Sequence, residues 1–145
     1  SAQGMLYCKS MSTVDFQLEH IGYLTDDIDR TARQFDLLGY HQGDTVDDDR
    51  QKTKICFLRK EGETAIELVQ PYADNATMLR MLKKHGCGPY HLCYACDDVD
   101  RLYQELTEED WTPLFKPVEA PALGNRKICY FFNADMGFVE LVNKK

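Results

Sequence analysis

The stretches HIGYLTDDIDR, residues 20–30, and HLCYACDDVDR, residues 91–101, decide the fold of this 145-residue chain. They share a His, a Tyr, three Asp and an Arg at matching positions. Later stretches repeat too, because KICFL at 54–58 returns as KICYF at 127–131, and AIELV at 65–69 returns as FVELV at 138–142. The offset is 71 residues at first (91 against 20) and 73 later (127 against 54). A period this long is no solenoid unit, so each half is a whole supersecondary module.

Each half predicts the element order β-α-β-β-β. The runs at 17–24 and 88–96 are short, apolar and bounded by turn or charged residues, as strands are. Both lead into Asp-rich segments that can cap a helix, followed by apolar residues at helical spacing. Gly39 is predicted to close the first helix. A less regular strand near 40–47 and 112–117 precedes two hairpin-forming runs in each half.

The repeat therefore predicts an α+β fold: two tandem β-α-β-β-β modules that form one cupped mixed sheet. The first module spans 15–85 and includes a connecting amphipathic helix, and the second spans 86–145, with the boundary near Gly86. Residues 1–10 are predicted to be a disordered or tag-derived N-terminus. The two modules together make one domain.

The composition excludes several classes of protein. A net charge of −7 and a pI near 5.0 disfavour nucleic-acid binding, which needs a basic face. No apolar run approaches the ~20 residues of a membrane span, and no signal peptide is recognisable. The six cysteines then indicate free thiols in a reducing compartment, so we expect a cytoplasmic protein.

Cys93 and Cys96 form a C-x-x-C pair, for which two functional interpretations exist. A zinc site needs a second such pair, which the sequence lacks. A redox pair is expected at the mouth of a helix, where the thiol pKa is lowered, but this pair lies inside a strand-like run. Strand alternation puts the two on opposite faces, so we interpret them as packing residues.

Two His and two Glu stand at matched points of the repeat. Strand alternation turns His20 and Glu67 away from the helix of the first module, and His91 and Glu140 away from that of the second. A glutamate between Ile or Val and Leu is unusual in a central strand, and here it occurs twice. Imidazole and carboxylate together suit a divalent metal. The sequence thus predicts one metal site, whereas two unrepeated residues, His41 and His85, are expected at the surface.

These residues and motifs resemble the vicinal oxygen chelate superfamily. It includes glyoxalase I, methylmalonyl-CoA epimerase, extradiol dioxygenases and the fosfomycin and bleomycin resistance proteins. The resemblance runs from Glu19 to Val142, and its most specific parts are HIGYLTDDIDRTARQFDLLGY, IELVQP, GPYHLCYACDDVD and GFVELV. Family members pair β-α-β-β-β modules into a cupped sheet around a metal.

The resemblance implies a ligand set of His20, Glu67, His91 and Glu140 for one divalent ion, with Ni, Zn or Co favoured over Mn or Fe. Dioxygenases of the family usually lack a ligand at the position of Glu67, and bleomycin-binding members typically lack the ligands. The full set therefore implies proton transfer next to a carbonyl polarised by the metal. By resemblance to glyoxalase I, Glu140 is the first choice of base and Glu67 the second.

Several positions depart from the patterns of individual family branches. Glyoxalase I proteins commonly carry Arg where this chain has Leu24, which argues against glutathione. Methylmalonyl-CoA epimerases share VQP, GPYH and GNRK, but carry a catalytic Glu where this chain has Arg50, with Asp48 or Asp49 as substitutes. Three residues are candidates for substrate binding, and the two arginines among them could bind a substrate anion: Arg50, Asn125 and Arg126.

We therefore predict a metal-dependent lyase or isomerase of the glyoxalase I (lactoylglutathione lyase) type, acting on a small α-oxo compound or its thiol adduct. The alternatives are a CoA-thioester epimerase resembling methylmalonyl-CoA epimerase and a non-catalytic protein that binds an antibiotic or another small molecule. We also expect a homodimer, because sheet edges need a partner and most soluble oligomers are twofold. The length of the linker favours pairing of both modules within one chain.

Overall fold

The structure is a computed structural model that describes residues 15–145, so the prediction for residues 1–10 lies outside the described residues. The first half contains β1 (Gln17–Leu24), α2 (Ile28–Asp36), β2 (His41–Asp48), β3 (Thr53–Arg59) and β4 (Ala65–Pro71). The connecting helix is α3 (Ala76–His85). The second half contains β5 (Gly88–Cys96), α4 (Val99–Thr107), β6 (Thr112–Ala120), the 3₁₀ helix η1 (Pro121–Leu123), β7 (Arg126–Asn133) and β8 (Gly137–Asn143). Both halves have the order β-α-β-β-β.

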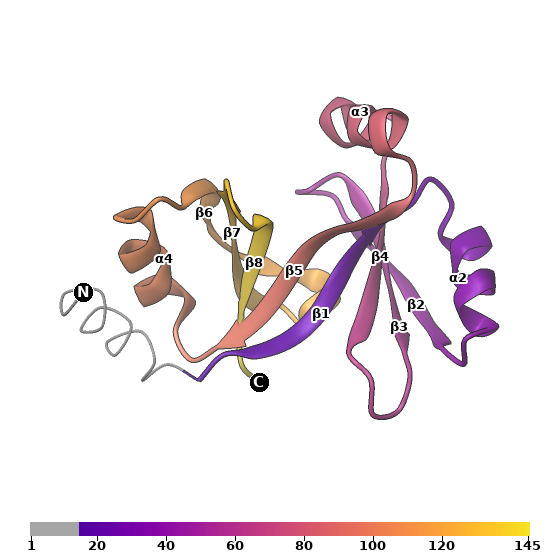
Figure 1. The fold of residues 1–145 in the computed structure, drawn as a ribbon, viewed down its shortest axis with the longest axis horizontal. Coiled ribbons are helices and arrows are strands. Elements are labelled where there is room, and N and C mark those ends of the chain that lie inside the picture. Colours follow the sequence, from indigo (N-terminus) through magenta and orange to yellow (C-terminus); the bar gives the residue numbers. More distant parts are fainter. Residues whose placement is uncertain (1–14) are drawn as a thin grey trace.

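The eight strands form one mixed sheet in the order β2-β3-β4-β1-β5-β8-β7-β6. Within each half the first strand runs parallel to the last, β1 with β4 and β5 with β8. The two halves join where β1 pairs antiparallel with β5, and these strands cross the middle of the molecule side by side (Figure 1). The predicted fold class is confirmed, and the pairing of modules occurs within one chain, as the linker indicated.

The helices α2 and α4 begin in the same way. The carboxylates of Asp27 and Asp98 accept hydrogen bonds from the backbone N–H groups of Arg30 and Arg101, as the repeated Asp residues predict. The helix α2 ends at Asp36, and the turn that follows it closes at Gly39, as predicted. Gly39 has a φ of 91°, and the Tyr40 N–H donates across it to the backbone oxygen of Phe35, as at a glycine-terminated helix end.

The sheet packs on both faces. On the outer face, α2 covers one cluster that contains Ile28, Ala32, Leu58, Ile66 and Leu68, and α4 covers a second cluster. A third cluster fills part of the concave face and draws on both halves, because Ile55 and Phe57 meet Cys93 and Tyr130 there. The concave face is therefore a shared interior in which side chains of both modules meet.

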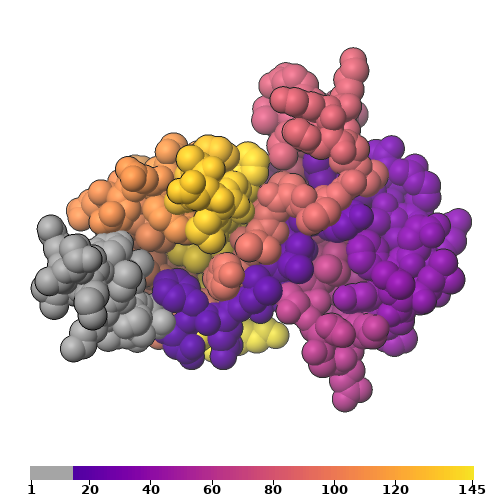
Figure 2. Space-filling model, in the orientation of Figure 1, coloured from indigo at the N-terminus to yellow at the C-terminus, as the bar shows by residue number. Residues whose placement is uncertain are grey.

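The connecting helix α3 stands apart from the sheet. Its N-cap is Asn75, whose side chain accepts from the Met78 N–H, and none of its residues is buried. The space-filling view shows it projecting beside the groove between the two lobes (Figure 2). None of the helices in the described part of the chain has the length and apolar character needed to cross a membrane.

The cysteines and unrepeated histidines agree with the predictions where the structure describes them. Cys93 and Cys96 are both buried and join different core clusters, on opposite faces of β5, and the five described cysteines are free. His41 and His85 are exposed. The two outermost strands, β2 and β6, leave open edges, and the homodimer stays a prediction.

Candidate metal centre

The four repeated residues meet on the concave face of the sheet. They lie on its four central strands: His20 on β1, Glu67 on β4, His91 on β5 and Glu140 on β8. One ligand atom from each lies within 4.8 Å of all the others, and none of the four residues is more than 3% exposed. Strand alternation alone thus led to the correct face for all four.

The spacing of the ligand atoms fits a divalent ion. His20 Nε2 lies 3.0 Å from Glu140 Oε1, 3.2 Å from His91 Nε2 and 3.5 Å from Glu67 Oε2. Ligand atoms about 2.0–2.2 Å from one ion lie about 3.0 Å apart along an octahedral edge and about 3.4 Å apart along a tetrahedral edge. Two nitrogens and two carboxylates at these separations are consistent with a divalent metal site.

The ring of His91 lies against Gly22, its partner in the β1–β5 ladder. A Cβ atom at position 22 would lie 2.0 Å from Cε1 and Nδ1 of this ring, so only glycine leaves room for it. The Tyr130 hydroxyl lies 3.0 Å from His91 Nε2 and 3.2 Å from Nδ1. Backbone approach on one side and the phenol on the other therefore fix the position of His91.

His20 has a different setting. Its ladder partner is Cys93, and the ring of Phe57 meets it edge-on with the centroids 5.2 Å apart. His20 Nδ1 is buried without a hydrogen-bond partner among the described residues, and Glu19 Oε1 is 3.8 Å away. Burial lowers the pKa of His20, but the charge of Glu67 and hydrogen bonds, including one to Glu140, outweigh it and hold the pKa well above its usual value.

Glu140 is the carboxylate most tightly held by the histidines. Its Oε1 lies 3.0 Å from His20 Nε2 and 3.2 Å from His91 Nε2, whereas the distances from Glu67 to these atoms are 3.5 Å. Burial raises the pKa of Glu140, but hydrogen bonds from both histidines and their charge overcome it and lower the pKa to about 2. A cation is thus the natural partner for this ionised and buried carboxylate.

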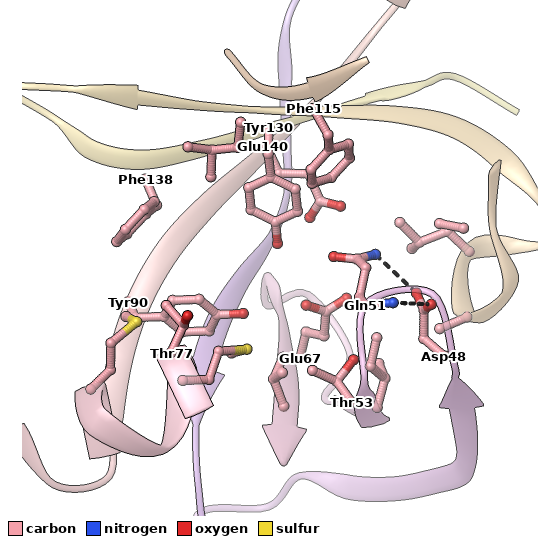
Figure 3. A pocket seen from close by; sticks show the side chains of 18 residues that line it. Asp48, Gln51, Thr53, Glu67, Thr77, Tyr90, Phe115, Tyr130, Phe138 and Glu140 are labelled. Atoms are coloured by element: carbon pink, nitrogen blue, oxygen red, sulfur yellow. Dashed lines mark hydrogen bonds between the residues drawn. The ribbon is translucent and has the colours of Figure 1, made fainter. Parts of the chain in front are cut away.

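A pocket of about 170 Å³ opens above the cluster. Glu67 and Glu140 reach it from opposite modules, and Tyr90 and Tyr130 direct their hydroxyls into it (Figure 3). Burial, reinforced by the nearby glutamates, raises the pKa of both tyrosines well above the usual range, so both are neutral donors. Most of the remaining wall is apolar: Ile55, Val69, Met78, Met81, Phe115 and Phe138.

A third carboxylate faces the same pocket. Asp48, at the end of β2, is 2% exposed, and both its oxygens accept hydrogen bonds from Gln51, one from the backbone N–H and one from the side-chain amide (Figure 3). Thr53 also lines the pocket, and its Oγ1 is buried without a hydrogen-bond partner among the described residues. Asp49 is exposed and accepts from the Tyr72 hydroxyl, away from the pocket.

The three residues predicted to bind a substrate anion do not line this pocket. Arg50 lines an adjacent hollow, which shares Gln51, Met78 and Phe115 with the pocket. Arg126 donates to the backbone oxygens of Leu123 and Asn143 and lies 3.6 Å from Glu19, so its described contacts are structural. Asn125, with φ of 60°, forms the turn before β7.

Sequence reasoning missed Gly22, Phe57, Tyr90 and Tyr130. The repeat held a signal for two of them, because the offset of 73 pairs Phe57 with Tyr130, and each lies opposite the glutamate of its own module. Gly22 gave no such signal, since its role depends on the register of β1 against β5.

The chain was then compared with known proteins. A family model described as the glyoxalase/bleomycin resistance protein/dioxygenase superfamily matches residues 19–130. The chain belongs to this superfamily. Its buried cluster of two His and two Glu is in keeping with the metal site that the resemblance implied.

This superfamily member is similar to several individual proteins. The uncharacterized protein YqjC of Bacillus subtilis is 30% identical over 98 residues, which are 64% of this chain and 66% of YqjC. The mitochondrial methylmalonyl-CoA epimerase of Bos taurus is 25% identical over 126 residues, 85% of this chain and 70% of that protein. A solved Streptomyces coelicolor methylmalonyl-CoA epimerase in complex with 2-nitronate-propionyl-CoA shares the fold, with a TM-score of 0.78, 18% identity and coverage of 88% of this chain and 96% of that one.

Proposed function

We propose that this protein is a metal-dependent epimerase of an acyl-CoA thioester. The observation that carries the proposal is the pair of carboxylates from opposite modules, Glu140 and Asp48, that face one pocket above the His and Glu cluster. The curated relative named methylmalonyl-CoA epimerase supports this reaction over the glyoxalase reaction that the sequence put first.

His20, Glu67, His91 and Glu140 would hold the ion, with Ni, Zn or Co as the preferred metals. When bound, it would act as a Lewis acid on a substrate carbonyl, which makes the adjacent C–H acidic. The chain itself supplies the position of that carbonyl, the exclusion of water by the apolar wall, and the groups that move the proton.

Glu140 is the base that removes the α-proton in this proposal, and Glu67 is the second choice. Inversion also requires a group that delivers a proton to the opposite face of the planar carbon. Asp48 would meet this need once it has taken up a proton from solvent, because it is buried, lines the pocket and comes from the other module. The sequence offered Asp48 or Asp49 as the second catalytic carboxylate. In this proposal Asp48 has that role, because Asp49 is exposed.

The adjacent hollow suits the long tail of a thioester. It is lined by Arg50, Gln51, Asn75, Met78, Phe115 and Val118 and continues from the pocket through three shared residues. An acyl group in the pocket would leave its pantetheine arm in this hollow, with Arg50 near the anionic end of the coenzyme. Thus Arg50 would bind the coenzyme rather than the reacting group.

A glyoxalase-type lyase is the second candidate. The observation in its favour is the presence of two glutamates, Glu67 and Glu140, in the cluster. Leu24 is buried where glutathione-using relatives commonly carry Arg, which weighs against that thiol. The non-catalytic binding function is less favoured, since it needs no pair of carboxylates in the pocket.

The test of the function is α-proton exchange in deuterated water, followed by NMR. The protein is loaded with Ni, Co or Zn and offered methylmalonyl-CoA, 2-methyl-3-oxobutanoyl-CoA, and the hemithioacetal of methylglyoxal and glutathione. We expect metal-dependent exchange and loss of configuration with at least one CoA ester. Conversion of the hemithioacetal alone would show a glyoxalase-type lyase instead of an epimerase. Absence of reaction with every compound would contradict both enzymes and favour the non-catalytic binding function.

The role of Arg50 has its own matched test. Arg50→Ala is expected to raise KM for a CoA ester about tenfold, the loss that ~1.4 kcal/mol of binding implies, without changing KM for the N-acetylcysteamine ester of the same acid. Arg33→Ala, which removes an exposed charge on α2, is the control. If Arg50→Ala changed KM equally for both esters, the coenzyme would not bind in this hollow.

A further inference from the structure

The walls of the pocket carry an unusual balance of charge. Three carboxylates line it, those of Asp48, Glu67 and Glu140. In the part of the chain that the structure describes, no Lys, Arg or His side chain is among the lining residues. The two histidines of the cluster do not line the pocket either, because they are buried behind the two glutamates. A ligand in this pocket therefore meets acidic and apolar groups but no cationic side chain.

A divalent ion in the cluster would not reverse this balance. Its two positive charges are matched by Glu67 and Glu140, its two carboxylate partners. Asp48 is left over, because both of its oxygens already accept hydrogen bonds from Gln51, which is uncharged. The loaded pocket consequently keeps one negative charge that no described residue neutralises, and at 2% exposure this charge is poorly screened.

The hydrogen-bond donors of the pocket are neutral as well. Tyr90 and Tyr130 point their hydroxyls into it, and the Thr53 hydroxyl is buried without a partner among the described residues (Figure 3). An unpartnered buried hydroxyl indicates a group that the ligand satisfies. Such donors suit a ketone or hydroxyl oxygen, whereas a buried carboxylate calls for a cation.

We propose that the acyl group taken by this pocket is uncharged, as in a 2-alkyl-3-oxoacyl thioester, and is not a malonyl-type group with a free carboxylate. This deepens the proposed function and rests on it, and it separates the protein from relatives named for methylmalonyl-CoA. Thr53 is the donor to the neutral oxygen, Asp48 is the group that rejects a carboxylate, and Phe115 and Phe138 contact the alkyl part.

The location of Arg50 agrees with this assignment. Arg50 is the cationic residue among those that line the adjacent hollow. A thioester with its coenzyme in that hollow would keep its negative charges outside the pocket and its neutral end inside. The distribution of charge along the two cavities thus matches an ester that is anionic at one end only.

The test is equilibrium binding of two nearly isosteric probes by titration calorimetry. 2-Methyl-3-oxobutanoyl-CoA has a methyl group where methylmalonyl-CoA has a carboxylate oxygen, so the pair differs chiefly in charge. Both are used as mixtures already equilibrated at C2, so that turnover produces no net heat. We expect the neutral ester to bind roughly tenfold or more tightly to the metal-loaded protein, as like charges at partly buried sites imply.

Matched variants test whether Asp48 causes the preference for the neutral ester over methylmalonyl-CoA. Asp48→Asn should reduce the difference in Kd between the two esters by about tenfold, chiefly by improving binding of methylmalonyl-CoA. Asp49→Asn removes the same charge one residue away, on the exposed side bonded to Tyr72, and should leave the difference unchanged. Thr53→Val should weaken binding of the neutral ester alone.

The outcomes separate this inference from the proposed function. Equal or tighter binding of methylmalonyl-CoA by the loaded wild-type protein overturns the inference, even if that ester is epimerised. Equal effects of Asp48→Asn and Asp49→Asn overturn the role of Asp48. Absence of proton exchange with tight, selective binding of the neutral ester would instead overturn the epimerase reaction and leave the charge preference standing.

Discussion

Each of the two modules places one His and one Glu in the cluster but surrounds them differently. Phe57 and Tyr130 are equivalent in the repeat, and each meets its own module's histidine edge-on, at centroid distances of 5.2 and 5.1 Å. Only Tyr130 adds a hydroxyl, which lies 3.0 Å from His91 Nε2. The second module thus adds a polar group beside its histidine, where the first module has only an apolar ring.

The β1–β5 ladder shows the same asymmetry. Gly22 and Cys93 are equivalent, and each is the ladder partner of the histidine of the other module. Glycine leaves space for the ring of His91, whereas Cys93 keeps its side chain beside His20. Duplication therefore supplied the ligands twice, and later differences between the halves made one side of the site unlike the other. Four experiments test how much of the function depends on this difference.

The largest effect is expected from exchanging the two glutamates for amides. Glu140→Gln should lower kcat by about 10²–10⁴-fold, because an amide oxygen can ligate a metal but cannot accept the proton. Metal content, measured by mass spectrometry, should fall much less. Glu67→Gln is the matched variant and should retain more activity. Full turnover in metal-loaded Glu140→Gln would move the base to the first module.

The second effect concerns the ladder. Gly22→Ala should lower metal affinity about 100-fold and stability by about 1–3 kcal/mol, because the new methyl group occupies the place of the His91 ring. Cys93→Ala, the equivalent change in the other module, should alter metal affinity little. Competition with a chromogenic chelator and thermal unfolding measure both. Similar affinities for the two variants would contradict the asymmetry of the ladder.

The third effect concerns the aromatic pair. Tyr130→Phe makes the second module resemble the first, and should weaken metal binding about tenfold because the hydroxyl near His91 Nδ1 no longer orients the ring. Phe57→Tyr is the converse change, and brings a hydroxyl near His20. An unchanged metal Kd in Tyr130→Phe would show that the ring, and not its hydroxyl, orients His91.

The smallest effect is on thermal stability as a function of pH in the metal-free protein. The pKa of Glu140 falls from 4.5 to about 2 on folding, so its stabilisation is complete above pH 4.5 and is lost as the pH drops toward 2. The pKa of His20 rises above 6.5 on folding, so its stabilisation is complete below pH 6.5 and is lost as the pH rises through the raised value.

Tm should therefore be highest between pH 4.5 and 6.5 and fall by a few degrees on either side, given roughly 2–4 °C per kcal/mol for a domain of this size. Scanning calorimetry across pH 3–9 is the measurement. Glu140→Gln should flatten the acid side and also reduce the fall on the alkaline side, because Glu140 helps to raise the pKa of His20. If Tm of Glu140→Gln depended on pH in the same way as Tm of the wild type, the charge of Glu140 would not stabilise the fold.

The sequence predicted the fold and the cluster for one reason: residues that recur in a duplication occupy equivalent places. His20 and His91, like Glu67 and Glu140, could be found without any structure. The position of Asp48 could not, because β2 is exposed almost throughout and only its last residue turns inward. Arg50 lies in a turn and Arg126 is the first residue of β7, and the strand pattern does not determine the direction of either side chain. Gly22 needed the ladder register, which arises when two distant strands meet.

One consequence follows from the single ladder between the halves. Among the described strands, only β1 and β5 pair across the two modules, and each module contributes two of the four ligands. Neither half can hold an ion alone with this donor set, so ion binding stabilises only the docked arrangement. At a free metal concentration 100 times Kd this amounts to about 2.7 kcal/mol. The ion would then contribute to the cooperativity of folding, because it favours unfolding of both halves in one transition.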